Sequence, residues 1–148
     1  MGVTVSGKNN FDSWSGEFEK ALTRALFRVG LEAEGNAKDH ITENQSVDTG
    51  LLRNSITFAI SGGNANISSY RATKPDKKGV YRVGKYEGTA PSDTKKSVYI
   101  GTNVEYGGFV ELGSRGRAGK PFLKPAATQH SNDYKQIFTS ELKGGGGS

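Results

Sequence analysis

The segment Val98–Ala127 constrains the fold more than any other, because a strand, a polar loop and the start of a helix follow one another within it. Its first residues alternate in polarity, with Val98, Ile100 and Val104 on one side of a period-two pattern. Such alternation is typical of a strand that buries one face. We therefore predict a central strand here, which the rest of the chain has to cover with a second layer.

A polar loop is predicted after this strand. Residues 109–112 form a short apolar knot, and Gly113–Lys120 then contains no apolar side chain larger than alanine. We predict that Gly113–Lys120 is a solvated, mobile loop. Pro121–Leu123 re-enters the core, and Pro125 suits the first position of a helix because its missing N–H costs nothing there. This order of elements is typical of a scaffold that presents a loop to a neighbouring molecule.

A long helix is predicted from Asp12 or Ser13, either of which suits the N-cap, to about Asn44. Its apolar side chains gather into one core-facing stripe. The stripe consists of Trp14, Phe18, Leu22, Ala25, Val29 and Ala33. Phe27 and Leu31 fall on the opposite face, one turn apart, and a pair of large apolar residues there indicates a second contact surface. We predict a subunit interface at this pair; a small exposed patch or a sheet edge lying over it is the alternative.

The middle of the chain is predicted to hold a hairpin and then a long basic loop. Ser55–Ile60 and Asn64–Tyr70 are predicted to pair as strands around a Gly-Gly turn. Arg71–Lys96 carries eight Lys or Arg against three acids, so it accounts for the whole net charge of +5. Its basic residues of interest are Lys74, Lys77, Lys78, Arg82 and Lys85. A loop of this length in a compact domain is usually functional or disordered, and only Val80–Val83 is compatible with a weak strand.

Together these elements predict a single α+β domain over residues 1–143. A second helix over Ala126–Lys143 and the long helix are expected to pack on one face of a three- to four-stranded antiparallel sheet. Residues 1–11 are predicted to form a polar arm, and Gly144–Ser148 resembles an expression linker. No run approaches the roughly 18 apolar residues of a membrane span, so no membrane contact is expected.

Few residues suggest catalysis or metal binding. The chain has no cysteine, and His40 and His130 lie far apart without partners at ligand spacing, so we expect no metal and no cofactor. Asp48-Thr49-Gly50 matches the start of the catalytic loop of dimeric aspartic proteases, in which two carboxylates share a proton. Asp48 follows a polar run rather than a buried strand, however, and capping of the next turn is ordinary for this residue type. We expect that the protein is not an enzyme and keep the protease as a lesser alternative.

A nucleic-acid-binding module is the other alternative. Tyr70, Tyr81 and Tyr86 are interleaved with the basic residues of Arg71–Lys96 and its flank. Aromatic rings among cations are able to stack on bases while the cations neutralise phosphates. A solvated loop, or one that lies on an acidic neighbour, explains the same pattern.

Four short blocks carry a resemblance to a known family. In chain order they are Val47–Ile56, Ile100–Tyr106, Val110–Gly113 and Pro121–Ala126. In this order and separation they resemble the tail-component family of long-tailed bacteriophages, the tail-completion or head–tail joining proteins. The resemblance covers residues 47–127, and the helices predicted on either side fit the α+β plan of that family. The basic segment departs from the family pattern.

This resemblance implies a structural virion protein that forms a ring, typically a hexamer. The ring is expected at the neck, between the tail tube or terminator protein and the head connector or stopper protein. Assembly is expected in the host cytoplasm, with no catalysis, no cofactor and at most a passing contact with phage DNA.

A ring subunit needs two different surfaces that meet head to tail around a closed rotation. We predict that the Phe27 and Leu31 face is one of them, and that the knot of Tyr106, Phe109 and Glu111 is the other.

The two polar segments are predicted to contact neighbouring rings. Gly113–Lys120 is expected to become ordered on assembly, with Arg115, Arg117 and Lys120 pairing with acidic groups of the next ring. The basic segment Arg71–Lys96 either faces DNA in the lumen or clamps a neighbouring protein ring. A lumen coated with positive charge would retard DNA ejection, which favours the clamp.

Overall fold

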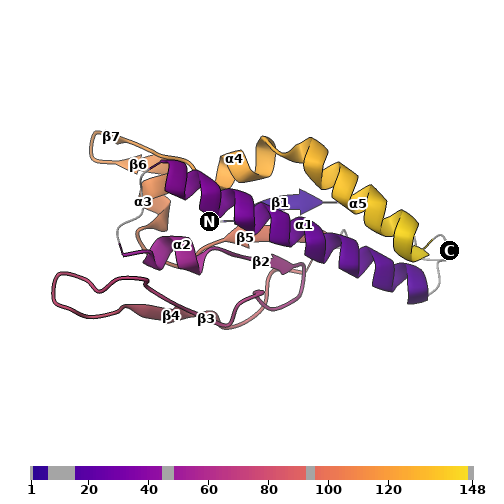
Figure 1. Cartoon of the computed structure of the whole chain (residues 1–148), viewed down its shortest axis with the longest axis horizontal. Helices are drawn as coiled ribbons and strands as arrows, with labels where there is room; N and C mark the ends of the chain where they lie inside the picture. Colours follow the sequence, from indigo (N-terminus) through magenta and orange to yellow (C-terminus); the bar gives the residue numbers. More distant parts are fainter. Residues whose placement is uncertain (1, 7–15, 45–48, 93–95, 147–148) are drawn as a thin grey trace.

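A computed structural model describes residues 2–6, 16–44, 49–92 and 96–146. Three strands form the central sheet: β1 (Gly2–Ser6), β2 (Thr57–Ile60) and β5 (Ser97–Gly101). They are antiparallel in the order β1-β5-β2, so the predicted central strand does lie in the middle (Figure 1). Val98 and Ile100, which the alternation placed on the buried face, are at most 1% exposed.

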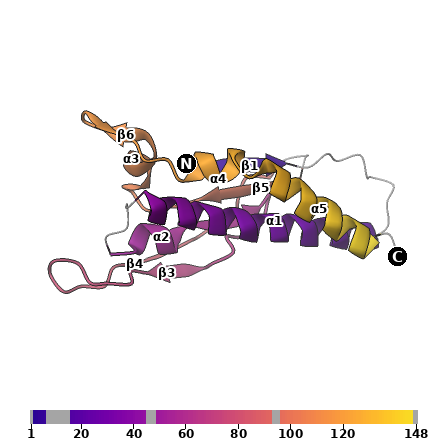
Figure 2. The same cartoon turned by 45° about the horizontal axis from the view of Figure 1, so that its top comes forward.

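Three helices cover one face of this sheet. α1 (Gly16–Glu43) crosses its whole length, and α4 (Leu123–Thr128) and α5 (Ser131–Gly146) follow beside it (Figures 1 and 2). The predicted stripe on α1 is confirmed from Leu22 to Ala33, because Leu22, Ala25, Val29 and Ala33 are buried, while Phe18 at its start is half-buried. Trp14 and the predicted N-cap lie outside the described residues. The α+β class with helices on one face of an antiparallel sheet is therefore confirmed. No helix in the described part of the chain has the length and apolarity that a bilayer crossing requires.

Three boundaries differ from the prediction. The arm expected at the N-terminus includes a strand, since β1 pairs with β5 along its whole length. The second helix is broken into α4 and α5, and polar Ser131 and Asp133 stand at the new start, where such residue types are favoured. Pro125 is the third residue of α4 rather than the first.

The predicted hairpin is wrong, although its turn forms. Gly63 N donates to Ile60 O at 2.8 Å, but β2 pairs with β5, while β3 (Ser69–Arg71) pairs with β4 (Val83–Lys85). The segment after the turn has only Ala65 and Ile67 as apolar side chains. Two such residues supply too little apolar surface for a face that packs on the core.

Gly30 permits close contact between α1 and the sheet. A Cβ built on it would stand 2.2 Å from a ring carbon of Phe58, which is itself only 2% exposed. Glycine lowers the intrinsic stability of the helix, but here it lets the Phe58 ring of β2 lie directly on the helix backbone.

Gly30→Ala is expected to lower the free energy of unfolding by about 2 kcal/mol, because overpacking a core costs more than the roughly 1 kcal/mol that alanine adds to a helix. Gly35 is the matched control, since it is exposed and a Cβ at this position would meet nothing within 4 Å. Gly35→Ala should raise stability by up to about 1 kcal/mol. Urea unfolding of both variants tests this; the same sign for both would contradict it.

Candidate interaction surfaces

The knot and the mobile loop predicted from the sequence are both regular structure. Residues 109–112 belong to a short helix, α3 (Gly107–Leu112). The loop is a two-stranded hairpin made of β6 (Gly113–Ser114) and β7 (Arg117–Ala118). The prediction failed at both segments for the same reason. Their side chains are mostly exposed, but their backbone N–H and C=O groups bond to one another within each segment.

The hairpin and α3 enclose a groove with an apolar floor and a basic rim. Its floor includes Tyr106, Phe109 and Val110, and its rim carries the cationic residues of the hairpin. Phe109 is 63% exposed and its neighbour Leu112 is 73% exposed. We call this the hairpin surface: Tyr106, Phe109, Leu112, Arg115, Arg117 and Lys120. The sequence analysis assigned the knot to contacts within a ring and the cations of the loop to the next ring. In the structure the two sets form one surface, to which Leu112 is added.

Arg115 stands at the tip of this hairpin in an uncommon backbone conformation. The φ angles of Arg115 and Gly116 are 48° and 81°, so both residues lie in the left-handed region. Two successive residues of this kind form the tight hairpin turn in which Asn-Gly is the favoured sequence. An arginine is disfavoured here relative to asparagine. Arg115 therefore occupies an exposed tip at a conformational cost that asparagine would largely avoid.

Glu111 does not belong to the candidate interface, contrary to the prediction. It is only 5% exposed. Its Oε1 accepts from the backbone N–H of Phe122 at 3.0 Å and of Leu123 at 2.8 Å, and its Oε2 accepts from that of Lys124 at 3.3 Å. These donors belong to the first turn of α4, so Glu111 caps this helix from outside it.

Lys120 also makes a hydrogen bond within the chain. Its Nζ donates to Asn44 O at 3.3 Å, and Asn44 Nδ2 donates back to Pro121 O at 2.9 Å. Asn44 follows the last residue of α1, where a cation is favoured by the helix dipole. Lys120 is therefore less available to a partner than Arg115 and Arg117, which are both exposed.

The outer face of α1 is exposed as predicted. Phe27 is 42% exposed and Leu31 is 43% exposed. The Phe27 ring also contacts Phe58 edge-on, with 5.2 Å between ring centroids. Phe27 thus stabilises the fold as well as being exposed. A substitution at Leu31 therefore tests the outer face of α1 more directly.

The basic segment Arg71–Lys96 contains an ordered hairpin rather than only a long loop. Asp76 closes its tip, because Oδ1 accepts from the backbone N–H of Lys78 and Val80, and Oδ2 accepts from Arg82 Nε at 3.1 Å. The bond from the Val80 N–H is the main reason that the pKa of Asp76 lies below its usual value. We call residues 69–85 the basic arm.

The cations of the basic arm are not equivalent. Arg82 pairs with Asp76, and Lys85 pairs with Glu87. The ion pairs found between described residues include none of Lys74, Lys77 and Lys78, all of which are exposed. These three lysines are the ones most available for a partner. Apolar side chains are exposed beside them, namely Val80, Tyr81 and Val83.

Two asparagines attach the basic arm to the body. Asn54 Nδ2 donates to Arg71 O at 2.7 Å, while Asn103 Nδ2 donates to Lys85 O at 2.8 Å and its Oδ1 accepts from Tyr70 OH. Sequence reasoning assigned neither asparagine a role, although both lie in blocks that carry the family resemblance. Their place in these blocks is the only signal, because Arg53 precedes Asn54 and Thr102 precedes Asn103, so neither asparagine stands out from its polar neighbours.

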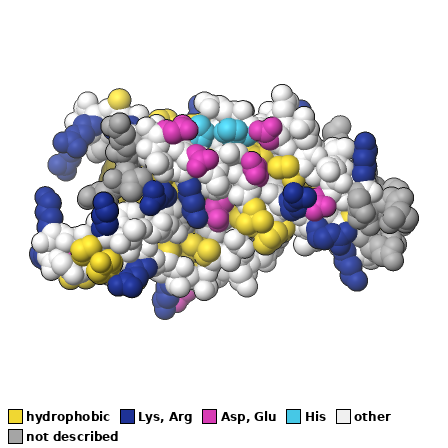
Figure 3. Space-filling model, in the orientation of Figure 1, with side chains coloured by type: hydrophobic (Ala, Val, Ile, Leu, Met, Phe, Trp, Pro, Cys, Tyr) yellow, Lys and Arg dark blue, Asp and Glu magenta, His cyan; other side chains and the backbone are white. Residues whose placement is uncertain are grey.

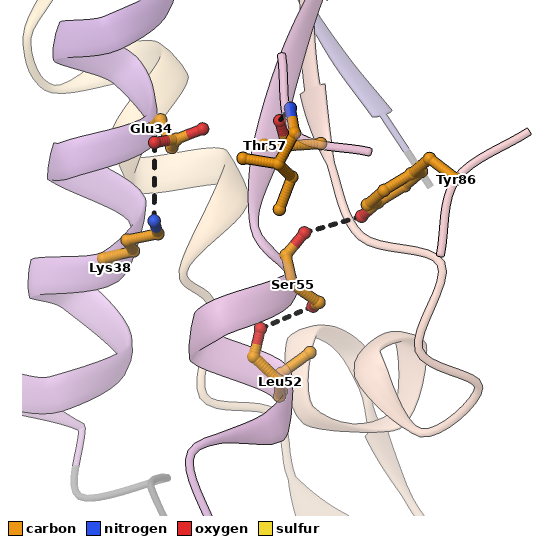
Figure 4. A network of polar contacts seen from close by, with 7 residues as sticks. Glu34, Lys38, Leu52, Ser55, Thr57 and Tyr86 are labelled. Atoms are coloured by element: carbon orange, nitrogen blue, oxygen red, sulfur yellow. Dashed lines mark hydrogen bonds and ion pairs between the residues drawn. The ribbon is translucent and has the colours of Figure 1, made fainter. Parts of the chain in front are cut away.

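Tyr86 continues this attachment into the interior. Its OH donates to Ser55 O at 2.6 Å (Figure 4). Ser55 is fully buried, and its Oγ lies 2.5 Å from Thr102 Oγ1. Burial raises the pKa of Tyr86 and of Tyr70. Both rings therefore hold the arm in place as neutral phenols.

Charge is unevenly distributed over the molecule. The β6–β7 hairpin and the basic arm project at the same end (Figures 1 and 2), and Lys and Arg side chains surround that end in Figure 3. Acidic side chains gather over the middle of the same face, around the two histidines. The two histidines, far apart in the sequence, lie side by side in the fold, with His40 Nε2 3.2 Å from His130 Nε2. Asp48, the candidate protease residue, lies outside the described residues.

Residues 8–113 match the family model described as "Bacteriophage HK97-gp10, putative tail-component". The matched range ends at the first residue of the β6–β7 hairpin and thus contains α1, the basic arm, β5 and α3, but neither α4 nor α5. No curated protein and no solved structure matches the chain.

Proposed function

Because this chain belongs to the HK97-gp10-like family of bacteriophage tail components, we propose that it forms a ring at the neck of the virion, completes the tail and joins it to the head connector. The ring is typically a hexamer in this proposal, and its neighbours are the tail tube or terminator protein on one side and the connector or stopper protein on the other. The role is structural and needs neither catalysis nor a cofactor.

The observation that carries this proposal is the presence of two unlike exposed surfaces on one small chain. The hairpin surface combines large apolar side chains with arginines, and the outer face of α1 exposes Phe27 and Leu31. Unlike surfaces that meet head to tail generate a closed ring when the rotation closes. Exposed apolar residues close to one another are also typical of interaction sites.

The basic arm is assigned to the contact with a neighbouring protein ring. Its shape supports this, since the arm is fastened at its base by Asn54 and Asn103 and exposes Val80 and Val83. Exposed apolar side chains next to exposed lysines suit an acidic protein surface with apolar spots.

The alternative of nucleic-acid binding has less support from the arm. Tyr70 and Tyr86 are tied to the body through their hydroxyls, and the guanidinium of Arg71 covers one face of the Tyr81 ring at 4.4 Å from its centroid. A platform for stacked bases needs exposed ring faces. Filter binding across a salt series tests this alternative, because phosphate contacts make affinity fall steeply with salt.

Electron microscopy of the purified protein, alone and mixed with tails that lack it, tests the proposed role. We expect rings that cap the tail end nearest the head, and tails that then join to filled heads. Protein that stays monomeric at high concentration and leaves the tail ends bare would refute the proposal.

The arginines of the hairpin surface give a sharper test. Arg115→Asn combined with Arg117→Gln should leave the fold intact, and Asn at position 115 is even better suited to the turn. We expect at least tenfold fewer particles in which tail and head are joined. This corresponds to a loss of about 1.4 kcal/mol or more of binding free energy, because the contact with acidic groups of the next ring loses two cations.

The matched control removes two charges elsewhere. Lys135→Gln combined with Lys143→Gln changes the net charge equally at exposed positions of α5, away from both proposed contact surfaces. An equal loss of joining in both double variants would show that net charge, and not the hairpin, is responsible.

A further inference from the structure

His40 and His130 approach each other through the same ring nitrogen. His40 lies in the last turn of α1, and His130 lies in the link between α4 and α5. Their Nε2 atoms are 3.2 Å apart and their ring planes are inclined by 54°. The side chains are 17% and 28% exposed, so water reaches both rings from one side. In Figure 3 they lie next to each other on the surface, with acidic side chains on both sides.

A carboxylate lies beside the other nitrogen of each ring. Glu43 Oε2 is 3.8 Å from His40 Nδ1, and Asp133 Oδ2 is 3.8 Å from His130 Nδ1. At 3.8 Å neither carboxylate accepts a hydrogen bond from its ring, but its charge favours the tautomer that carries the proton on Nδ1 and leaves a lone pair on Nε2. Two Nε2 lone pairs that face each other at this distance repel unless a cation lies between them.

We propose that His40 and His130 bind a late first-row divalent cation such as Zn²⁺ or Ni²⁺ through their Nε2 atoms. Zn–N bonds of about 2.0 to 2.1 Å at a tetrahedral angle place two ligand nitrogens about 3.3 Å apart. The observed separation of 3.2 Å is close to this value, and a modest turn of the two rings would direct both Nε2 lone pairs at one ion. Imidazole nitrogens suit these metals, and Glu43 and Asp133 lie close enough to move into hydrogen-bond distance of the Nδ1–H groups, as carboxylates do behind metal-binding histidines.

The site has two protein ligands, and water fills the other positions. No group of three or more His, Cys, Asp or Glu suited to a metal occurs among the described residues. Binding is therefore weaker than at a structural site with four protein ligands. The bound ion would connect the end of α1 to the link between α4 and α5.

The surroundings hold the two rings in place. Tyr134, whose ring centroid is 6.3 Å from that of His130, donates its hydroxyl to Ala126 O and accepts from Asn36 Nδ2 at 3.0 Å. Asn36 lies one turn before His40 on α1. This bridge fixes α1 against the start of α5 without any metal, so the pair is preorganised for an ion.

The rival explanation is a simple hydrogen bond, in which one neutral ring donates from Nε2 to the other. The two explanations differ in their response to metals. Untagged full-length protein, stripped with EDTA, is melted with Zn²⁺, Ni²⁺, Cu²⁺ or Mg²⁺ and titrated calorimetrically. We expect Zn²⁺ to raise the melting temperature by about 5 °C at one hundred times its dissociation constant, Cu²⁺ to bind more tightly than Ni²⁺, and Mg²⁺ to have no effect.

Variants assign the effect to the pair. His40→Gln and His130→Gln should each abolish the Zn²⁺ shift, while Gln129→Ala, in the same link and exposed, should keep it. If either histidine variant is too unstable to melt, the calorimetric stoichiometry of the parent protein decides, and we expect one ion per chain. No Zn²⁺ shift in the parent protein, or a shift that survives both histidine substitutions, would overturn the proposal and leave the hydrogen bond.

Discussion

Glu111→Ala is expected to lower the free energy of unfolding by about 3 to 5 kcal/mol, the largest loss we expect from a polar substitution in this chain. The carboxylate accepts three backbone N–H groups at the start of α4, and two of these bonds are buried. Hydrogen bonds to a charged group contribute about 1.5 to 3 kcal/mol each, and a buried donor without a partner costs about 1 to 3 kcal/mol. Urea unfolding followed by circular dichroism measures the difference.

Two further variants separate the cap from other effects. Glu111→Gln keeps the shape and one oxygen but turns an amide NH₂ towards backbone donors, so about 2 kcal/mol should be lost. Glu105→Ala removes an exposed acid from the neighbouring segment and should change stability by less than about 0.5 kcal/mol. A loss below about 1 kcal/mol for Glu111→Ala would show that water replaces the carboxylate.

This cap also fixes the hairpin surface. The β6–β7 hairpin lies between Glu111 and Phe122, so the bonds of Glu111 close the base of the loop that carries Arg115 and Arg117. Lys120 N adds a bond to Val110 O at 2.7 Å. The hairpin is therefore held at its base by buried contacts although its tip is exposed.

The sequence predicts best what depends on local periodicity. The alternation at Val98 and Ile100 correctly identified the central strand, and the α1 stripe from Leu22 to Ala33 correctly identified the helix face that packs on it. Both patterns are written into consecutive residues, and burial of one face is enough to enforce them. The pairing of β1 with β5 joins residues about a hundred positions apart, and no local pattern reveals such a partner.

Segments judged mobile from their composition are ordered by single side chains. Asp76 closes the tip of the basic arm, and Asn54 and Asn103 fasten its base. A polar side chain that bonds to a distant backbone group looks, in the sequence, like any solvated residue. Glu111 was assigned to an interface for this reason, since its three partners lie eleven to thirteen positions away. The His40–His130 pair, ninety positions apart, was missed in the same way.

The second large effect is expected on assembly of the proposed ring. Phe109→Asp is expected to abolish ring formation while leaving the fold intact, because its side chain is 63% exposed and contributes little to the core. An aromatic anchor at the centre of an interface is worth about 2 kcal/mol or more, roughly 30-fold in affinity. A closed ring repeats the same joint between every pair of neighbours, so the loss recurs at each one. Mass measurement of the purified variant and the yield of infectious particles both report it.

The opposite face of the joint is tested with Leu31→Asp rather than Phe27→Asp. Phe27 contacts the buried Phe58 ring, so its loss would weaken the fold as well as the joint. Leu31→Asp should match Phe109→Asp in its effect on ring size, since each removes one half of the same contact.

Val83→Asp is the control, because it places the same charge at a 71% exposed apolar residue of the basic arm, which is assigned to a neighbouring ring rather than to the joint. It should leave ring size unchanged. Full-size rings from both Phe109→Asp and Leu31→Asp would show that copies of this chain meet through other surfaces.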